Sequence, residues 1–489
     1  MSVSFNQIPV SLMTPGVFAE FDTSKMVSGT PSMPGELLLI GQRLAVGQVA
    51  AGVPTRVLSD SQGMADFGRG SLLAAMIAAV KKANPNVDLW AVALDDLAAG
   101  VAAAGAVTVT GPAVGGGTIA LYIGGRRMPV GVAANDTANT IAANMAASIN
   151  ADPDCAATAA VDGVTLSKVN ITCRWKGETG NSLDIRHSYF QGERLPAGVT
   201  LAVTAMTGGA GNPDITAALT ATAGGWYNTI TTPYTDGANM LVLETELDGR
   251  WGPMRQSEGV AFTALGGTHA AGSTWASTRN NPLIVAVGLQ KSPTPPWIAA
   301  AIAAAVDAGE PDPGRPRQTL PLTGMLAPAD ADRFTQTERN LHLKDGLATY
   351  TVDAGGNCLV ERLVTNHTQN TAGLPDAGLV DVETIRVLAY LRFSTRVRLT
   401  QKYPRHKLAN DGTRFGGGQA VATPSILRGE MIALFAEWME AGLVENISQF
   451  KRDLVIERDA NDANRVNAII PPDVINQLRI LALQFQPRL

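Results

Sequence analysis

Glu36-Leu-Leu-Leu-Ile40 is a short apolar run that ends at Gly41, and it decides how the chain starts to fold. A run of this length without polar alternation is typical of a strand buried on both faces. A helical pattern over Ser71–Ala83 follows, and Asp88–Leu94 is strand-like again. This order predicts two parallel strands joined by a crossover helix, which is the basic unit of an α/β core.

The same alternation returns far downstream. Strand-like runs at Tyr227–Thr231, Gly259–Ala264 and Pro282–Gly288 alternate with helical patterns, the last of which is Pro296–Ala308. Apolar strands separated by helices of about ten residues favour a mostly parallel sheet that is covered on both faces. We therefore predict an α/β core that is formed by residues 33–97 and 213–330.

Residues 98–212, between the two halves of this core, have a different character. Ala, Gly, Thr and Val dominate, and short alternating runs such as Thr118–Ile123 and Thr200–Ala205 predict strands. One helix is predicted after Asp136, a good N-cap residue. Because an insertion into a surface loop costs little loop-closure entropy, we predict an inserted β-rich domain on the outside of the core.

The rest of the chain predicts two further parts. Residues 331–375 form a connecting segment, with a helix expected over Ala329–Leu343 and then a hairpin. Residues 376–489 form an α+β C-terminal domain. Its predicted elements are a long helix over Val380–Lys402, a second helix opened by Thr423-Pro424, and strands at Asp453–Arg458, Arg465–Ile470 and Leu478–Gln486.

Composition excludes several classes of protein. The net charge of −5 and the 17% of charged residues argue against a surface that binds nucleic acid or anionic membrane as a whole. The longest apolar runs span ten residues, whereas a membrane-crossing helix needs about 20. Cys155, Cys173 and Cys358 have no paired spacing, so we predict free buried thiols.

The motifs of common enzymes and cofactor sites are missing. No Gly-Lys dipeptide occurs, which excludes a phosphate-binding P-loop, and the five histidines have no metal-binding spacing. Ser32 precedes every His and Asp of the core, so it has the wrong order for a subtilase nucleophile. Asp459 and Asp462 fit a turn better than a cation site. We predict no catalytic residue, no cofactor and no metal.

One basic segment stands out on this acidic chain. The charges from Asp381 to Asn410 sum to +5, whereas the whole chain carries −5. The alternatives for this segment are a solvated helix face, a phosphate contact and a contact with an acidic protein surface. The candidate patch consists of Arg392, Arg396, Arg398, Lys402, Arg405 and Lys407.

Both ends of the chain resemble strands. Val3 and Phe5 alternate with polar residues and Ile8 follows them, while Leu481, Leu483 and Phe485 share one face of a run that ends at Pro487. A single strand is not stable in water, so each end must join a sheet in its own subunit or in another chain. Residues 1–32 thus form an N-terminal arm, and a C-terminal arm closes the chain.

The chain resembles the contractile tail sheath proteins of myophages, most of all those of the Mu-like kind. The similarity rests on the order of several segments and extends over most of the chain except residues 98–212. These segments are Pro15-Gly-Val-Phe-Ala-Glu20, Asn281-Pro-Leu-Ile-Val-Ala-Val-Gly288, Arg333-Phe-Thr-Gln-Thr-Glu-Arg-Asn-Leu341, Asp381–Pro404 and Pro424–Gln486.

This resemblance implies a mechanical part and not an enzyme. In the family the α/β core is subtilisin-like without protease chemistry, and six subunits form each ring around a tail tube protein. The rings stack helically between the baseplate and the tail terminator proteins of a virion that is assembled in the host cytoplasm. The terminal arms pair with C-terminal domains of neighbouring subunits, and contraction drives the tube through the host envelope. The basic patch is our candidate for the surface that faces the tube.

Three other functions are alternatives to this one. A tailocin or type VI secretion apparatus uses a similar sheath and is the nearest alternative. A degenerate hydrolase on the α/β core would react with a serine-directed probe. A nucleic-acid-binding protein using residues 381–407 would bind in a salt-dependent way. We expect neither of the last two activities, and no direct insertion into a membrane.

Overall fold

The computed structural model describes residues 13–19, 33–416 and 418–488. Two compact units can be distinguished. The large unit contains residues 34–389, 442–445 and the chain from 473 onward, while the small unit contains residues 390–441 and 446–472. The chain therefore returns to the large unit after it has formed the small one.

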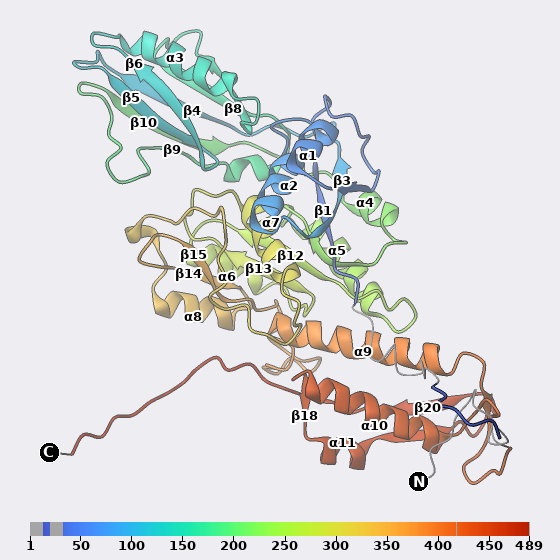
Figure 1. The fold of residues 1–489 in the computed structure, drawn as a ribbon. Helices are drawn as coiled ribbons and strands as arrows, with labels where there is room; N and C mark the ends of the chain where they lie inside the picture. The colour runs from blue at the N-terminus through green and yellow to red at the C-terminus, as the bar shows by residue number, and fades with distance from the viewer. Residues whose placement is uncertain (1–12, 20–32, 417, 489) are drawn as a thin grey trace. The chain divides into compact units, whose positions relative to one another are not determined.

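A six-stranded sheet forms the core of the large unit (Figure 1). β1 (Glu36–Gln42) lies inside it between β11 and β3. The order is β13-β12-β11-β1-β3-β2, and all neighbours are parallel except β2 with β3. Leu37, Leu38, Leu39 and Ile40 are fully buried, as expected for a strand covered on both faces. The other strands are β2 (Thr55–Val57), β3 (Asp88–Leu94), β11 (Tyr227–Thr231), β12 (Val260–Leu265) and β13 (Ile284–Gly288).

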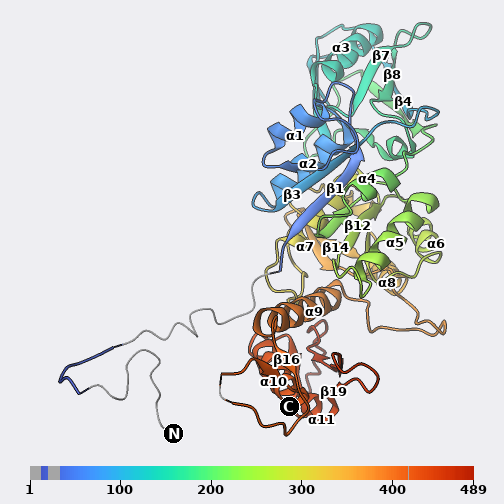
Figure 2. The same ribbon diagram turned by 90° about the vertical axis from the view of Figure 1, so that its right-hand side faces the viewer.

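Helices cover both faces of this sheet, as the alternating pattern predicted. α2 (Leu72–Ala83) and α7 (Pro296–Ala308) pack against each other and against β1. Nine of the thirteen residues of α7 are buried, because its alanines allow close approach to the strands. Figure 2 shows α4 and α5 on the side of β1 opposite to α1 and α2. The remaining bounds are α1 (Asp60–Phe67), α4 (Thr216–Ala221), α5 (Gly237–Trp251) and α6 (His269–Ala276).

The inserted segment is β-rich, as predicted. Two antiparallel sheets, ordered β10-β4-β8-β7 and β6-β5-β9, form together with one helix, α3 (Ala138–Ala151). Val101 and Ala210 exchange two backbone hydrogen bonds of 2.8 and 3.1 Å, and this bridge closes the insertion at its base. The strands are β4 (Ala104–Thr110), β5 (Gly117–Ile123), β6 (Arg126–Val132), β7 (Ala157–Val161), β8 (Lys168–Cys173), β9 (Ile185–His187) and β10 (Thr200–Thr207).

The predicted cap of α3 was wrong by one residue. The hydroxyl of Thr137 accepts from the backbone N–H of Thr140 at 3.2 Å, so Thr137 is the N-cap. The carboxylate of Asp136 accepts instead from the backbone N–H of Ala133 at 2.7 Å and closes the preceding turn. Both residue types suit either role, and the local backbone decided between them.

The connecting segment contains α8 (Gln336–Lys344) and the hairpin of β14 (Thr349–Val352) with β15 (Cys358–Arg362). The helix starts later than the predicted Ala329, because Thr335 and Glu338 form a capping box that sets its first turn. A short 3-10 turn, Asp330–Asp332, precedes it. Ala348 exchanges backbone hydrogen bonds with Ala286 and Gly288 of β13, which ties the hairpin to the edge of the core sheet.

The small unit is built around helices. α9 (Val382–Lys402) begins in the large unit and its later residues belong to the small one, which also contains α10 (Pro424–Glu440) and α11 (Ile447–Asp453). Phe435 and Phe450 stack at 4.0 Å between ring centroids and form the centre of its core. Thr423 caps α10 and Pro424 occupies its first turn, as predicted. The short strands are β16 (Lys407–Leu408), β17 (Val421–Ala422), β19 (Val455–Arg458) and β20 (Val466–Ile469).

Two further expectations concern the cysteines and membrane crossing. Cys155, Cys173 and Cys358 are buried free thiols, in agreement with their spacing. Over residues 13–19, 33–416 and 418–488, no helix combines the length and the hydropathy that a membrane crossing requires.

Candidate inter-subunit site

The C-terminal end of the chain, which belongs to the large unit, is an extended segment (Figure 1). β21 (Asp473–Val474) pairs with β18 (Val444–Glu445), and residues 475–488 then form neither helix nor strand. The predicted strand Leu478–Gln486 is therefore absent, because no other described segment lies beside it to accept its backbone hydrogen bonds. We call residues 480–488 the C-terminal arm.

The C-terminal arm exposes its apolar side chains. Residues 480–487 carry no charge, and the side chains of Leu481, Leu483 and Phe485 are 72%, 68% and 87% exposed. A contiguous exposed apolar segment with unpaired backbone groups is a surface for pairing with another chain. Val3, Phe5 and Ile8, the corresponding residues of the predicted N-terminal arm, lie outside the described residues.

The small unit carries a hairpin with open edges. β19 and β20 pair only with each other in the described part of the chain. Val455 and Ile469 are the paired residues at the open end of the hairpin, and their side chains are 42% and 65% exposed. Asp459 closes the turn, since its carboxylate accepts from the backbone N–H groups of Asn461 and Asp462 at 2.8 and 3.0 Å. These contacts are those of the turn that the sequence predicted at Asp459.

The root of the C-terminal arm is attached to the large unit by two kinds of contact. The N–H of Ile475 donates to the carbonyl of Leu443 at 3.1 Å. Arg479 then donates through Nη2 to Asp381 Oδ1 at 2.9 Å and to Glu383 Oε2 at 2.8 Å. Asp381 directly precedes α9 and Glu383 lies in its first turn, so the arm begins beside the start of that helix.

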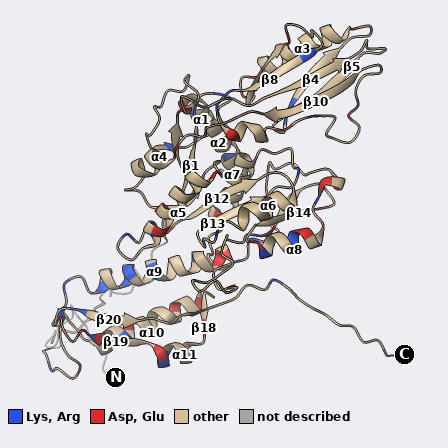
Figure 3. Cartoon of the chain, turned by 180° about the vertical axis from the view of Figure 1, so that it is seen from behind, with Lys and Arg blue, Asp and Glu red and all other residues tan. Residues whose placement is uncertain are grey.

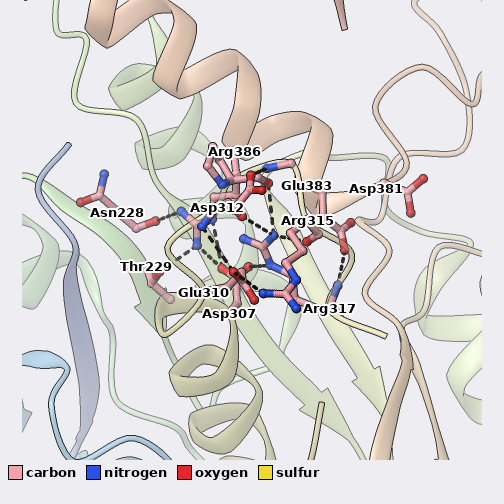
Figure 4. Close-up of polar contacts among 12 residues, drawn as sticks. Asn228, Thr229, Asp307, Glu310, Asp312, Arg315, Arg317, Asp381, Glu383 and Arg386 are labelled. Carbon is pink, nitrogen blue, oxygen red and sulfur yellow. Dashed lines mark hydrogen bonds and ion pairs between the residues drawn. The ribbon is translucent and has the colours of Figure 1, made fainter. Parts of the chain in front are cut away.

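A buried ionic cluster lies beside the first turns of α9 (Figure 4). Asp307, at the end of α7, is fully buried and accepts from Arg317 Nε and Arg386 Nε at 3.0 Å each. Arg386 also donates to the hydroxyl of Thr229 at 2.7 Å and to the carbonyl of Asn228 at 2.5 Å. The cluster thus joins α7, β11 and the first turns of α9.

Opposing effects set the pKa values of these carboxyl groups. Burial alone would raise the pKa of Asp307, but Arg386 and Arg317 outweigh it and the pKa is lowered. Burial also opposes ionisation of Asp381, and its pKa is lowered because Arg362 and Arg479 contact it. For Glu383 burial dominates over the attraction of Arg479, so the pKa is raised.

The predicted basic patch is partly neutralised by the next helix. Basic residues follow one another along α9 (Figure 3). Arg398 contacts both Glu430, at 3.0 Å, and Glu437 of α10, and Lys402 reaches Glu430 at 2.8 Å. Burial opposes ionisation of Glu430, yet Lys402 and Arg398 lower its pKa. The remaining patch residues are Arg392 and Arg396, which are half-buried, and Arg405 and Lys407, which are exposed.

Sequence reasoning missed these two glutamates because it summed charge over 381–410 alone. Glu430 and Glu437 are seven residues apart, and that spacing places them on one face of α10. The sequence contained this signal, but only the fold shows that this face meets α9. Arg479 was likewise overlooked, since it lies between apolar residues and resembles an ordinary strand residue.

Two domain families match the chain. Residues 208–366 match the phage tail sheath protein central domain, and residues 375–488 match the phage tail sheath C-terminal domain. Together these matches cover more than half of the sequence. The chain therefore belongs to the phage tail sheath family, and it is a structural, contractile tail component of a phage.

Individual proteins of the same kind are similar to this chain over nearly its full length. The chain is 43% identical over 488 residues to the Mu-like prophage FluMu tail sheath protein of Haemophilus influenzae, covering 99% of both chains. The sheath tail protein of Listeria innocua has a similar fold at 13% identity, with a TM-score of 0.50 over 92% of this chain and 94% of that one. The sheath tail protein of Desulfitobacterium hafniense gives 15% identity and a TM-score of 0.47 over 94% and 100%.

Proposed function

We propose that this sheath subunit is linked to its neighbours by strand exchange, with the C-terminal arm as the donor strand and the β19–β20 hairpin of another copy as the acceptor. The observation that carries this proposal is the uncharged, exposed run of residues 480–487 in the arm, on a chain whose described part also offers an open hairpin edge. A strand of about six residues forms several backbone hydrogen bonds, each contributing roughly 1 kcal/mol net. Burial of Leu481, Leu483 and Phe485 adds about 1.5–3 kcal/mol for each side chain.

The N-terminal arm is proposed as a second donor strand. Val3, Phe5 and Ile8 have the alternation that such a strand needs. Two strands per subunit would connect each copy to more than one neighbour. The resulting mesh stays joined while the globular surfaces slide past one another.

Membership in the family supports a proposal about the wider assembly. We propose that six subunits form a ring around the tail tube protein and that rings stack helically from the baseplate to the tail terminator. The sequence has no P-loop motif for ATP, and we propose that contraction releases free energy that assembly stored in the extended state. That release drives the tube through the host envelope and delivers the genome.

The basic patch is proposed to face the tail tube. Arg405 and Lys407 are exposed beyond the end of α9, and Arg392, Arg396, Arg398 and Lys402 precede them on the helix. Each surface ion pair contributes about 0–1 kcal/mol, so many weak contacts along the tail would hold the extended state and break together. An acidic tube surface is the partner that this charge requires.

The protein is proposed to be a non-enzymatic virion component that is assembled in the host cytoplasm. We propose that the α/β core is subtilisin-like in its layers only, without protease chemistry, cofactor or metal. Nucleic acid and direct insertion into membrane are not among its proposed contacts. A tailocin or type VI sheath is the less favoured assignment, because the full-length relative at 43% identity is a prophage tail protein.

The strand-exchange proposal can be tested by electron microscopy of the purified protein. Replacing Leu481, Leu483 and Phe485 by Ser should abolish sheath-like polymers and leave the circular dichroism of the monomer unchanged. The matched control replaces Ala482, Gln484 and Gln486 by Ser, which alters the other face of the same strand. Deletion of residues 1–12 tests the N-terminal arm in the same way. Polymers of normal length from the first variant would refute the C-terminal donor strand.

A further inference from the structure

Among the described residues, Arg479 is the last one whose side chain forms hydrogen bonds with the rest of the large unit. Its side chain is only 12% exposed, whereas Ile480 and Leu481 next to it are 84% and 72% exposed. The guanidinium donates to Asp381 and Glu383, and also to Gln318 Oε1 at 3.4 Å. Leu478, which precedes Arg479, is 71% exposed as well, so Arg479 is a largely buried side chain between exposed neighbours.

Both carboxylates that receive Arg479 are held in place by other contacts. Asp381 accepts from Arg362 through two hydrogen bonds of 2.8 Å. Glu383 is fully buried and accepts from the backbone N–H of Arg317 at 2.9 Å. Ion pairs in such a water-poor setting interact strongly, and removal of one partner leaves a buried charge uncompensated. The contact is therefore a built site and not a loose surface pair.

The same carboxylates connect the arm to the core. Glu383 lies in the first turn of α9, and Arg386 in the next turn binds Asp307 at the end of α7. Ionic contacts at the root of the arm and at the end of α7 are thus joined through the backbone of the first turns of α9. Among the described residues, the only backbone pairing near the root of the arm is that of the two-residue strand β21 with β18, together with the hydrogen bond from Ile475 to Leu443.

We propose that Arg479 fastens the C-terminal arm to its own subunit, so that tension on the arm is carried to α9 and α7 through Asp381 and Glu383. Arg479 is a positioning residue, since it sets where the arm begins without being part of the donor strand. The proposal rests on the strand exchange proposed above, because tension arises only when another copy holds the arm.

The test compares Arg479→Gln with Arg488→Gln, which removes the same charge from the exposed far end of the arm. Chymotrypsin cleaves after Leu and Phe, and mass spectrometry locates each cut in the monomer. Cleavage after Leu478 requires the root to enter the protease, so Arg479→Gln should speed it by about ten- to hundredfold, as expected for loss of charged hydrogen bonds. Cleavage after Phe485 should be unchanged in both variants. Arg479→Lys should restore part of the protection.

Polymers supply the second measurement. Arg479→Gln should still form polymers, because its arm is intact, but they should fall apart at a lower urea concentration than those of wild type and Arg488→Gln. Unchanged cleavage after Leu478 in Arg479→Gln would overturn the proposal that Arg479 fastens the arm. Faster cleavage, with polymers that resist urea as well as wild type does, would overturn its role in carrying tension. If the serine variant of the arm still polymerises, strand exchange fails, whereas the cleavage assay on the monomer still reports on Arg479.

Discussion

Substitution of Asp307 by Ala should be among the most destabilising changes in the large unit. Asp307 is fully buried and compensates two arginines, Arg317 and Arg386, whose side chains are 2% and 9% exposed. Its removal leaves two buried positive charges without their carboxylate. Breaking a buried ion pair by removal of one partner costs about 3–5 kcal/mol, and two arginines place the expected loss at the upper end of that range.

The measurement is urea unfolding of the monomer, with tryptophan fluorescence as the probe. Fluorescence reports on the large unit through buried residues such as Trp175 and Trp297. The matched control is Asp332→Ala, which breaks the ion pair of Asp332 with Lys291. Those two side chains are 33% and 61% exposed, so the control should cost no more than about 1 kcal/mol.

A third variant separates charge from packing. Replacing Asp307, Arg317 and Arg386 together by Leu, Met and Met removes all three charges and keeps most of the volume. It should recover much of the stability that Asp307→Ala loses, because a well-packed apolar cluster can replace a buried ion network. An Asp307→Ala variant as stable as Asp332→Ala would refute the electrostatic reasoning.

Three further predictions concern other parts of the chain. Burial lowers the pKa of His342, whose ring lies against that of His269. The unfolded state therefore binds the proton more readily, and stability should fall as the pH drops below about 6.5. The melting temperature of His342→Asn should depend less on pH between about 7.5 and 5.5. Phe435→Ala should destabilise the small unit by about 3–5 kcal/mol in urea unfolding, since it leaves a cavity beside Phe450. Thr335→Ala should cost about 1 kcal/mol by thermal unfolding and Thr335→Ser almost nothing, because only the hydroxyl caps α8.

Helices and strands that are specified by neighbouring residues could be predicted from the sequence. Leu37–Ile40 form a buried strand because four successive apolar residues need cover on both faces. Thr423 and Pro424 start α10 because a capping hydroxyl and a proline are both favourable at a helix start. Errors arose where two nearby residues suit the same role, as at Thr137, which caps α3 in place of Asp136.

The candidate site was only partly predictable. The apolar alternation of Leu481, Leu483 and Phe485 marks a strand that needs a partner, and the sequence contains that information because it concerns neighbouring residues. Residues 381–410 carry a formal charge of +5, but Glu430 and Glu437 of another helix form ion pairs with Arg398 and Lys402. Summing charge along a segment cannot detect a partner that folding brings from elsewhere.

The sequence by itself determined the α/β core, the β-rich insertion and the apolar character of the arm, since these depend on residues that follow one another along the chain. Only the tertiary structure decided where the arm is fastened and what its root is tied to. Asp307 and Arg386 are 79 positions apart, and Arg479 and Asp381 are 98 positions apart. No local pattern specifies such pairs, because a buried charge finds its partner only when the surrounding elements have packed.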